Sequence, residues 1–294
     1  MILVFGATGS IGRHVVRRLR REQVPFRAFV RDADRGRDLG GEVAVGDLDE
    51  PETLTTALAG VDRIFLCSPG AVPVSGPQPM IAQQNAVIDA AVRAGVRRVV
   101  KVSVWGARIG GLLAEGAHGE IEAHLEASGL EWSVLRPSGF MQNFLTGAGS
   151  FTSSGDLIGA YGDARVSYVD CADIAACAVA LLTGSRVGNE RFVVTGPHAL
   201  SHTEIAAELS TVIGRTVSYM DLPVREFAER LVAQGLPAAF ADDVAHLYRE
   251  VAAGTLSETT SAVADLTGRP ATTFAEFLDR KREALRHWPP RFPG

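Results

Sequence analysis

The sequence is poor in three features, and each shortage excludes a class of protein. It has only three cysteines, widely spaced within apolar segments, so neither a disulfide framework nor a C-x-x-C metal pair is available. It has no excess of positive charge, and a formal net charge of −5 argues against non-specific binding to nucleic acid. It has no apolar run long enough to cross a bilayer. We therefore expect neither nucleic-acid nor membrane binding, and we expect Cys67, Cys171 and Cys177 to be buried spectators.

The length and composition indicate a globular chain with a sizeable core. With 294 residues, 46% of them hydrophobic and 21% charged, the chain exceeds one small domain, and we expect one large α/β domain with an added lobe. Apolar residues begin at Met1, which leaves no space for the charged and apolar regions of a secretory signal. These features predict a cytoplasmic protein.

A glycine-rich turn at the start of the chain carries the strongest functional signal. The apolar run 1–5 is followed by Gly-Ala-Thr-Gly-Ser-Ile-Gly over residues 6–12. Apolar residues then recur at helical spacing, at Val15, Val16 and Leu19. A strand, a glycine-rich turn and a helix in this order are typical of a dinucleotide cradle.

The three glycines of this turn have separate roles in such a cradle. Gly6 allows the tight turn after the strand, Gly9 lets backbone N–H groups close on a pyrophosphate, and Gly12 lets the helix pack closely on the sheet. The phosphates would lie at the positive end of that helix. The remaining residues expected to contact the cofactor in this turn are Thr8, Ser10 and Ile11.

Strand and helix patterns alternate along the first 195 residues. Strands are expected over residues 2–5, 26–30, 43–45, 63–67, 98–103, 130–135, 166–169 and 191–194. Helices are expected over residues 11–22, 53–60, 80–94, 115–128 and 173–182. Alternation with right-handed crossovers predicts a doubly wound parallel sheet.

The fold class predicted is α/β, with a Rossmann-like doubly wound parallel sheet and a smaller, mostly helical C-terminal lobe on the substrate side. We expect the dinucleotide-binding core over residues 1–150, with the chain returning to it at about 165–195. The smaller lobe is expected over residues 196–294, together with 138–164. The stretch 138–162 is rich in Gly, Ser and Phe without a clear period, which is typical of a segment that leaves the sheet to shape a pocket.

Four further motifs accompany the opening turn. They are Val-Arg-Asp at 30–32, Val-Gly-Asp-Leu at 45–48, His-Gly-Glu-Ile-Glu at 118–122, and Leu-Arg-Pro-Ser-Gly-Phe-Met-Gln-Asn-Phe at 135–144. Together they resemble the NmrA-like family of atypical short-chain dehydrogenases, especially its type 2 NAD(P)H:quinone oxidoreductase branch. The resemblance covers nearly the whole chain. It implies a cofactor-binding Rossmann domain, a small C-terminal lobe and a substrate cleft between them.

The residues after the second strand decide which dinucleotide is expected. An acidic residue there accepts from the ribose 2′-OH, whereas an arginine pairs with a 2′-phosphate. The resemblance places Arg31 at the 2′-phosphate, which favours NADPH over NADH. The adjacent Asp32 could instead serve a ribose diol or cap the following helix.

Other cofactor contacts are expected at the ends of the third and fourth strands. The resemblance implies that Asp47 and Leu48 hold the adenine edge, although Asp47 is equally suited to capping the next helix. Ser68 and Pro69 end the fourth strand at the carboxyl edge of the sheet, where such sheets bind ligands.

The chain lacks the tyrosine-lysine dyad of ordinary short-chain dehydrogenases, in which a lysine four residues later lowers the pKa of a tyrosine acid. Tyrosine occurs at positions 161, 168, 219 and 248, and the residues four places on are Arg165, Ala172, Pro223 and Ala252. Only two lysines are present, Lys101 and Lys281. Carbonyl reduction by the usual dyad is therefore disfavoured.

Other polar residues offer an alternative. Reductase relatives in the wider family use a lysine at the start of the helix before the sixth strand, and His118 stands at the matching place. Histidine relays protons near neutral pH, with an ordinary pKa of about 6.5, but His118 could also simply hydrogen-bond a neighbouring loop. Lys101 and Ser103 share one face of the fifth strand, and either could hold the nicotinamide or its ribose or be a satisfied core polar group. We predict His118 and Ser103 as catalytic residues and Lys101 as a cofactor contact.

The expected substrate site is an apolar aromatic slot. The side chains that could form it are Trp105, Phe140, Met141, Phe144 and Phe151, with Asn143 offering one orienting hydrogen bond. Core packing is the alternative role of each aromatic side chain. Hydride transfer to an electron-poor ring requires proximity, such a slot and protonation that water can supply. Neither a G-x-S-x-G nor an H-E-x-x-H motif is present, so we expect no metal site.

The sequence therefore predicts an NAD(P)H-dependent oxidoreductase that transfers a hydride from NADPH to a quinone or a similar flat, conjugated small molecule. The alternative is a regulator of the NmrA type, which binds the dinucleotide without turning it over and signals the redox state to a protein partner. A homodimer is compatible with both functions.

Overall fold

The chain is divided into two compact units. The structure is a computed structural model that describes residues 1–74, 76–146, 150–186, 188–286 and 288. Unit 1 comprises Met1–Pro137, Cys171–Val194 and Ala262–Arg269, and unit 2 comprises Ser138–Asp170, Thr195–Ser261 and Pro270–Gly294. Within the described residues, no helix combines the length and the apolar character needed to cross a membrane.

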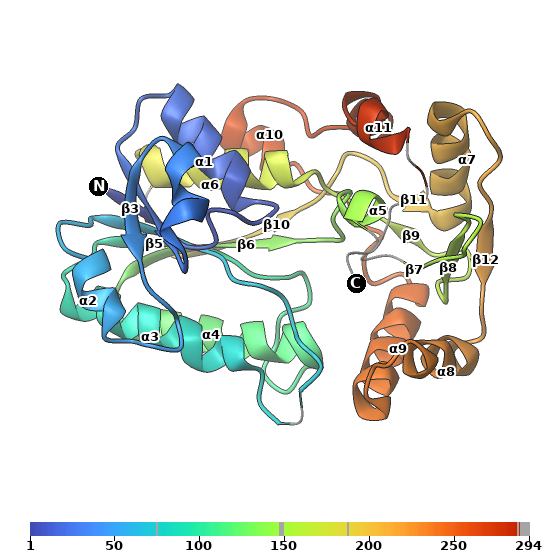
Figure 1. Ribbon diagram of the computed structural model, residues 1–294, viewed down its shortest axis with the longest axis horizontal. Helices are drawn as coiled ribbons and strands as arrows, with labels where there is room; N and C mark the ends of the chain where they lie inside the picture. Colours follow the sequence, from blue (N-terminus) through green and yellow to red (C-terminus); the bar gives the residue numbers. More distant parts are fainter. Residues whose placement is uncertain (75, 147–149, 187, 287, 289–294) are drawn as a thin grey trace. The chain divides into compact units, whose positions relative to one another are not determined.

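Unit 1 is built on a parallel sheet that has seven strands among the described residues, in the order β10-β6-β5-β4-β1-β2-β3 (Figure 1). The strands are β1 (Ile2–Val4), β2 (Phe26–Val30), β3 (Glu42–Val45), β4 (Arg63–Leu66), β5 (Arg98–Val102), β6 (Glu131–Pro137) and β10 (Glu190–Val194). The strand order changes direction between β1 and β4. In open sheets of this kind, ligands bind outside the carboxyl ends of the strands at that point.

Helices cover both faces of this sheet, which confirms the doubly wound architecture expected from the sequence (Figure 1). One face carries α1 (Gly12–Arg21), α6 (Cys171–Thr183) and α10 (Ala262–Thr267). The other face carries α2 (Thr53–Ala57), α3 (Pro79–Arg93) and α4 (Leu113–Ala127). A 3₁₀ segment, η1 (Ala33–Leu39), joins β2 to β3.

Apolar side chains fix the position of α4 on β5. Val99 of β5 lies in one buried cluster with Ile121 and Leu125 of α4. Since alternate residues of a strand share a face, Lys101 and the following Ser103 lie on the same side of the sheet as Val99, facing α4. The apolar contact therefore brings polar residues of β5 and α4 together.

Unit 2 combines short strands with helices. Its strands form a sheet of β12 (Tyr219–Asp221), β8 (Leu157–Gly159) and β7 (Ser150–Phe151) and a pair of β11 (Leu200–Ser201) and β9 (Arg165–Val166). Its helices are α5 (Asn143–Thr146), α7 (His202–Ile213), α8 (Val224–Ala233), α9 (Ala238–Ala252), α11 (Phe274–Arg280) and α12 (Arg282–Leu285). Two buried apolar clusters form its core.

Several expected boundaries differ from those in the structure. The first stretch of unit 1 ends at Pro137 and not at residue 150. The chain returns to unit 1 over Cys171–Val194, a shorter stretch than 165–195, and again over Ala262–Arg269, which was expected in the smaller lobe. The expected strand 166–169 is reduced to β9, after which Val169 makes only an isolated bridge to Phe140. The stretch 138–162 contains α5, β7 and β8, and β8 pairs with β12 about sixty residues later. Such long-range pairing of short strands leaves no local pattern in the sequence.

Candidate functional site

The glycine-rich turn joins β1 to α1, and its three glycines are required for different reasons. Gly6 has a φ of +68°, and a Cβ there would approach the carbonyl oxygen of Cys67 to 2.6 Å, while a Cβ at Gly12 would overlap the carbonyl of Gly6. These two glycines are required by the packing of the chain itself. Gly9 is exposed, and a Cβ there would meet only the oxygen of Gly6, at 3.2 Å. The absence of a side chain at Gly9 keeps the outer side of the turn open for a ligand.

The turn also presents unpaired hydrogen-bond donors. The N–H of Gly9 donates to the oxygen of Gly6 at 2.9 Å, and no side chain caps α1. In the part of the chain that the structure describes, the N–H groups of Ser10, Ile11 and Gly12 have no acceptor. Free N–H groups at the positive end of a helix suit the pyrophosphate of a dinucleotide. The exposed side chains beside these groups are those of Thr8 and Ser10.

The two residues after β2 are in different situations. Asp32 caps η1, since its side chain accepts a hydrogen bond from the N–H of Asp34 at 2.9 Å. Arg31 is exposed and makes no hydrogen bond or ion pair with any other described residue. The carboxylate is thus engaged in the structure of the loop, while the guanidinium is available for an anion such as a 2′-phosphate.

The loop after β3 holds Asp47 and Leu48. One carboxylate oxygen of Asp47 accepts from the N–H of Asp49 at 3.1 Å, and its carbonyl oxygen accepts from the hydroxyl of Thr53, also at 3.1 Å. Leu48 packs partly buried against the apolar core of unit 1. These contacts brace the loop, and the second carboxylate oxygen of Asp47 remains for an adenine amine.

The loop after β4 lies beside the glycine-rich turn, because Gly6 packs against the backbone of Cys67. The hydroxyl of Ser68 accepts from the side-chain amide of Gln84 at 2.7 Å. Pro69 is exposed. Ser68 is therefore oriented by α3, and Pro69 keeps its surface for a ligand.

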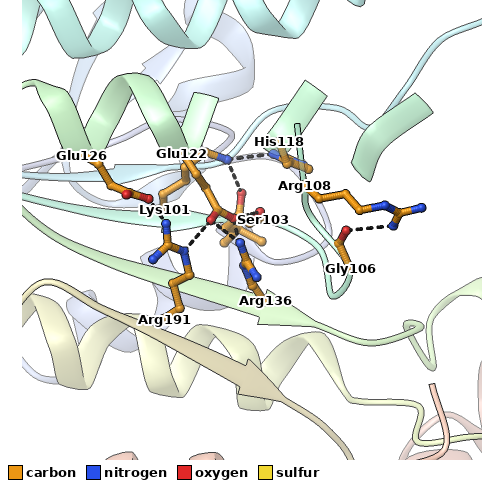
Figure 2. Close-up of polar contacts among 10 residues, drawn as sticks. Lys101, Ser103, Gly106, Arg108, His118, Glu122, Glu126, Arg136 and Arg191 are labelled. Atoms are coloured by element: carbon orange, nitrogen blue, oxygen red, sulfur yellow. Dashed lines mark hydrogen bonds and ion pairs between the residues drawn. The ribbon is translucent and has the colours of Figure 1, made fainter. Parts of the chain in front are cut away.

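A buried polar network lies between β5 and α4 (Figure 2). Lys101 and Ser103 come from the end of β5, and His118 and Glu122, four residues apart, come from one face of α4. Lys101 is fully buried, Ser103 and Glu122 nearly so, and His118 is 7% exposed. Charged and polar groups so deeply buried need partners, and each has one.

Lys101 and His118 are hydrogen-bonded to each other through nitrogen atoms. Lys101 Nζ lies 2.7 Å from His118 Nδ1 and also donates to the carbonyl oxygen of Val102 at 3.2 Å. A lysine amine has protons to donate, so we assign the acceptor role to Nδ1 and the proton of the neutral imidazole to Nε2.

Glu122 is saturated by three donors. Ser103 donates to it at 2.5 Å, Arg136 binds both of its oxygens at 3.1 and 2.6 Å, and Arg191 binds at 2.8 Å. Arg191 also forms an ion pair with Glu126. The single hydroxyl proton of Ser103 is directed at Glu122, so Ser103 can only accept a hydrogen bond from a ligand.

The burial of these groups changes their pKa values. Burial lowers the pKa of Lys101 to about 7; Glu122 and Cys67 oppose this shift, and Arg136 adds to it. Burial and the charge of Lys101 lower the pKa of His118 to about 2, so the imidazole is neutral. Burial would raise the pKa of Glu122, but the hydrogen bonds from Arg136, Ser103 and Arg191 together hold it below its usual value. Glu122 is therefore an anion at neutral pH, while Lys101 exchanges its proton near neutral pH.

The residues expected to line a substrate slot have different surroundings. Trp105 lies in unit 1, just after Ser103, and is partly exposed. Met141, Phe144 and Phe151 are buried in the core of unit 2, so they have the core-packing role that was the alternative to lining the slot. Phe140 and Asn143, also in unit 2, are partly buried.

The four tyrosines gather around His202 in unit 2. Tyr161 stacks on His202 with ring centroids 4.0 Å apart and on Tyr248 at 4.4 Å, and the hydroxyl of Tyr168 lies 3.0 Å from His202 Nε2. The ring of Tyr219 lies 5.2 Å from that of His202. We call these five residues the aromatic cluster.

Tyr161 and Arg165, which are four residues apart, both have structural roles. Arg165 donates to the carbonyl oxygen of Ala199 at 3.0 Å and forms an ion pair with Glu204 at 2.6 Å, while the ring of Tyr161 packs in the aromatic cluster. The pair is therefore not a variant of the dyad. Among the residues described, no group of three or more His, Cys, Asp or Glu side chains is arranged to hold a metal ion.

Glu122, the anion at the centre of the buried network, was not identified from the sequence. Glu122, Arg136 and Arg191 were not expected to take part in the site. The spacing of Glu122 four residues after His118 was a usable signal, since it places both on one face of α4. Arg191 comes from β10, on the far side of β6 from β5, and no local pattern connects it to α4.

The fold and the cradle define a nucleotide-binding unit of the Rossmann class, and the comparisons with known proteins refine this assignment. The chain belongs to the NmrA-like family, whose profile matches residues 1–278. The chain is 40% identical to the NAD(P)H azoreductase of Xenophilus azovorans, over 94% of this chain and 96% of that protein. It is 32% identical to quinone oxidoreductase 2 of Escherichia coli, over 94% and 96%.

Among solved structures, the NADPH-dependent quinone oxidoreductase of Escherichia coli in complex with NADPH is similar to this chain. The TM-score is 0.83 with 31% identity, and the alignment covers 95% of this chain and 99% of that chain. The similarity extends over both units, so it confirms the fold class and the family expected from the sequence.

Proposed function

We propose that this protein is an NADPH-dependent reductase of flat, conjugated aromatic compounds, with quinones and azo compounds as the acceptor classes to test. The glycine-rich turn carries the proposal, because its open outer side and free N–H groups fit a dinucleotide pyrophosphate. The names of the similar proteins, an azoreductase and a quinone oxidoreductase, support the choice of acceptors.

Residues of this chain have distinct parts in the proposed function. The N–H groups of the turn bind the pyrophosphate, and Arg31 binds the 2′-phosphate, which selects NADPH. The bound cofactor supplies a hydride. His118, at the carboxyl end of the sheet, protonates the reduced acceptor, and the hydroxyl of Ser103 accepts a hydrogen bond from the ligand. Trp105 provides an apolar contact for the acceptor. The homodimer and the cytoplasmic location remain predictions.

Cofactor binding is tested first by calorimetry on the full chain. Gly9→Asp should reduce NADPH affinity at least a hundredfold, because a carboxylate would stand where the phosphates approach, while the fold tolerates the change better than at Gly6 or Gly12. Arg31→Ala should weaken NADPH about tenfold or more and change NADH binding little, which lowers the preference for NADPH. Equal losses for the two cofactors would contradict the role of Arg31.

Turnover separates the enzyme from the regulator. NADPH absorbance is followed with a panel of quinones and azo dyes, with Gly9→Asp as the inactive control. Oxidation of NADPH that depends on an acceptor and is lost in the variant supports the reductase. Tight binding of NADPH without oxidation by any acceptor would support the alternative, a redox-sensing regulator.

A further inference from the structure

We propose that Lys101 and His118 form a proton relay, in which His118 gives the proton of Nε2 to the reduced acceptor and Lys101 replaces that proton at Nδ1. The inference rests on the proposed reductase function and narrows its substrates. It assigns the protein to acceptors whose hydride adduct is a strong base, such as azo compounds, because only these need a proton held ready.

The first support is the geometry of the two nitrogens. Lys101 Nζ and His118 Nδ1 are 2.7 Å apart and enclosed between β5 and α4. A proton can pass between them along an existing hydrogen bond without a water molecule. Because Nδ1 is the acceptor in this bond, the proton of the imidazole is on Nε2, at the opposite side of the ring.

The second support is that His118 Nε2 is available. Among the described residues, this nitrogen has no hydrogen-bond partner. It is also not fully enclosed by the protein. It therefore keeps a narrow access to the outside of unit 1. His118 lies near the start of α4, beside the carboxyl end of β5, and ligands of open parallel sheets bind at such strand ends.

The third support is that Lys101 has no carboxylate partner. A buried lysine with a purely structural role normally pairs with an acid. Here no acidic residue in the described part of the chain forms an ion pair with Lys101, since Glu122 is occupied by Ser103, Arg136 and Arg191. The hydrogen bonds of Lys101 are those to His118 and to the carbonyl of Val102.

The groups that face Lys101 also set its proton exchange. They are His118 and Glu122 from α4, Cys67 from the end of β4, and Arg136 from β6. Burial lowers the pKa of Lys101 to about 7, so the amine loses and regains a proton near neutral pH. Burial raises the pKa of the Cys67 thiol to about 11, so Cys67 stays neutral and takes no part in the exchange.

For an azo acceptor, each bond that forms in the relay is matched by a bond that breaks. After a hydride has reached one nitrogen of the azo group, the N=N double bond has become a single bond and the other nitrogen carries a negative charge. The Nε2–H bond of His118 breaks and an N–H bond forms on that nitrogen, while Nδ1 takes a proton from the ammonium of Lys101. Lys101 is left as a neutral amine and His118 with its proton on Nδ1. The relay is reset when Nε2 takes a proton from water and Nδ1 returns its proton to Lys101 along the same hydrogen bond. A reduced quinone is a far weaker base, and water protonates it readily.

Lys101 touches no reacting atom, so it is a positioning residue that also stores the proton. The test compares Lys101→Met with the full chain, for an azo dye and a quinone, each with saturating NADPH. Azo reduction should fall at least ten times more than quinone reduction. In the unchanged protein, kcat for the azo dye should fall as the pH rises through about 7, because the relay loses its stored proton, and this pH dependence should disappear in the variant.

Two further variants control the test. Lys281→Met removes the other lysine of the chain, which lies at the end of α11, and should change neither reaction. His118→Asn keeps an acceptor for Lys101 in its amide oxygen but carries no relay, so it should give the same selective loss of azo reduction even if Lys101→Met folds poorly.

Nuclear magnetic resonance of ¹⁵N-labelled histidine provides a readout without turnover. His118 should be protonated on Nε2 and should not titrate between pH 5 and 9, and its pKa should rise in Lys101→Met. Protonation on Nδ1 would overturn the relay. Equal loss of azo and quinone reduction in Lys101→Met would overturn the relay and leave the reductase standing, whereas absence of NADPH oxidation in the unchanged protein would overturn both.

Discussion

Among the residues that the structure describes, each unit contains one histidine that is buried and hydrogen-bonded, and the two differ in their partners. In unit 1, His118 is 7% exposed and accepts from Lys101; in unit 2, His202 is 4% exposed and lies beside the hydroxyl of Tyr168. Burial lowers the pKa of both, to about 2 for His118 and, with Asp221 opposing, to about 4 for His202. Burial and a lowered pKa therefore do not distinguish a reactive histidine from a packed one.

The two histidines differ in the partner of one ring nitrogen and in the access to the other ring nitrogen. Burial raises the pKa of Tyr168 well above its usual value, so Tyr168 does not exchange protons near neutral pH, and the other ring nitrogen of His202 is fully enclosed without a partner. His118 has a partner that exchanges its proton near pH 7 and a second nitrogen with access to the outside. We infer that His202 stabilises unit 2, while His118 serves the reaction.

The largest contrast is expected from the same substitution at both histidines. His118→Asn should lower azo reduction by about 10²- to 10⁴-fold, the usual contribution of a general acid. His202→Asn should leave kcat within about threefold, because it changes packing and no reacting group. Both are measured by steady-state kinetics at pH 6.5 with NADPH. Similar losses at the two positions would remove the distinction.

Substitution of Glu122, the anion at the centre of the buried network, should lower the stability of the protein. Glu122→Ala leaves Arg136 and Arg191 without their shared carboxylate and should reduce the free energy of unfolding by about 3 kcal/mol. The matched control is Glu126→Ala, which removes an exposed partner of Arg191 and should cost less than about 1 kcal/mol. Chemical denaturation measures both. Equal effects would show that the burial of Glu122 is unimportant for stability.

Removing the hydroxyl partner of His202 should have a smaller effect. Tyr168→Phe leaves His202 with both ring nitrogens unpaired in a buried place, which should reduce the free energy of unfolding by about 1–3 kcal/mol. NADPH affinity, measured by calorimetry, should not change, because the cradle is in unit 1. A loss of affinity with unchanged stability would contradict the structural role of the aromatic cluster.

The smallest expected effect is a change of the free energy of unfolding with pH, which the lowered pKa of Lys101 causes. Its pKa falls from an ordinary 10.5 to about 7 in the folded chain, so between these values the unfolded chain binds more protons and the folded state gains stability as the pH rises. The stability of the protein relative to Lys101→Met should therefore increase by about 1 kcal/mol between pH 7.5 and 8.5. Denaturation at a series of pH values measures the difference, and a constant difference would contradict the lowered pKa.

The fold of unit 1 could be predicted closely from the sequence, because most of its strands are buried apolar runs that glycine and proline delimit. The edge strand β3 is an exception, since it is largely exposed. β2, for example, begins and ends where the pattern placed it, and β1, β4 and β5 differ by one residue at their ends. Unit 2 could not be predicted in this way. β7, β8 and β12 have two or three residues each, and their pairing depends on contacts between distant segments.

The site was predictable where local geometry determines it. The spacing of Gly6, Gly9 and Gly12 predicted the cradle from local geometry. The role of Arg31 at the 2′-phosphate was implied by the family resemblance and stays a prediction. The pairing of Lys101 with His118 was not predictable, because it depends on the height at which α4 packs on β5. The sequence placed Lys101 near the cofactor or a carboxylate, whereas the structure gives it an imidazole.

The interleaving of the two units restricts how the protein can be divided. The chain passes from one unit to the other five times, and the last passage through unit 1, Ala262–Arg269, places α10 against α6 and β10. No single cut therefore releases an intact nucleotide-binding fragment. A truncation after Ser261 would strip a helix from the sheet of unit 1, so hybrid reductases made by exchanging substrate lobes must keep α10 with its native sheet.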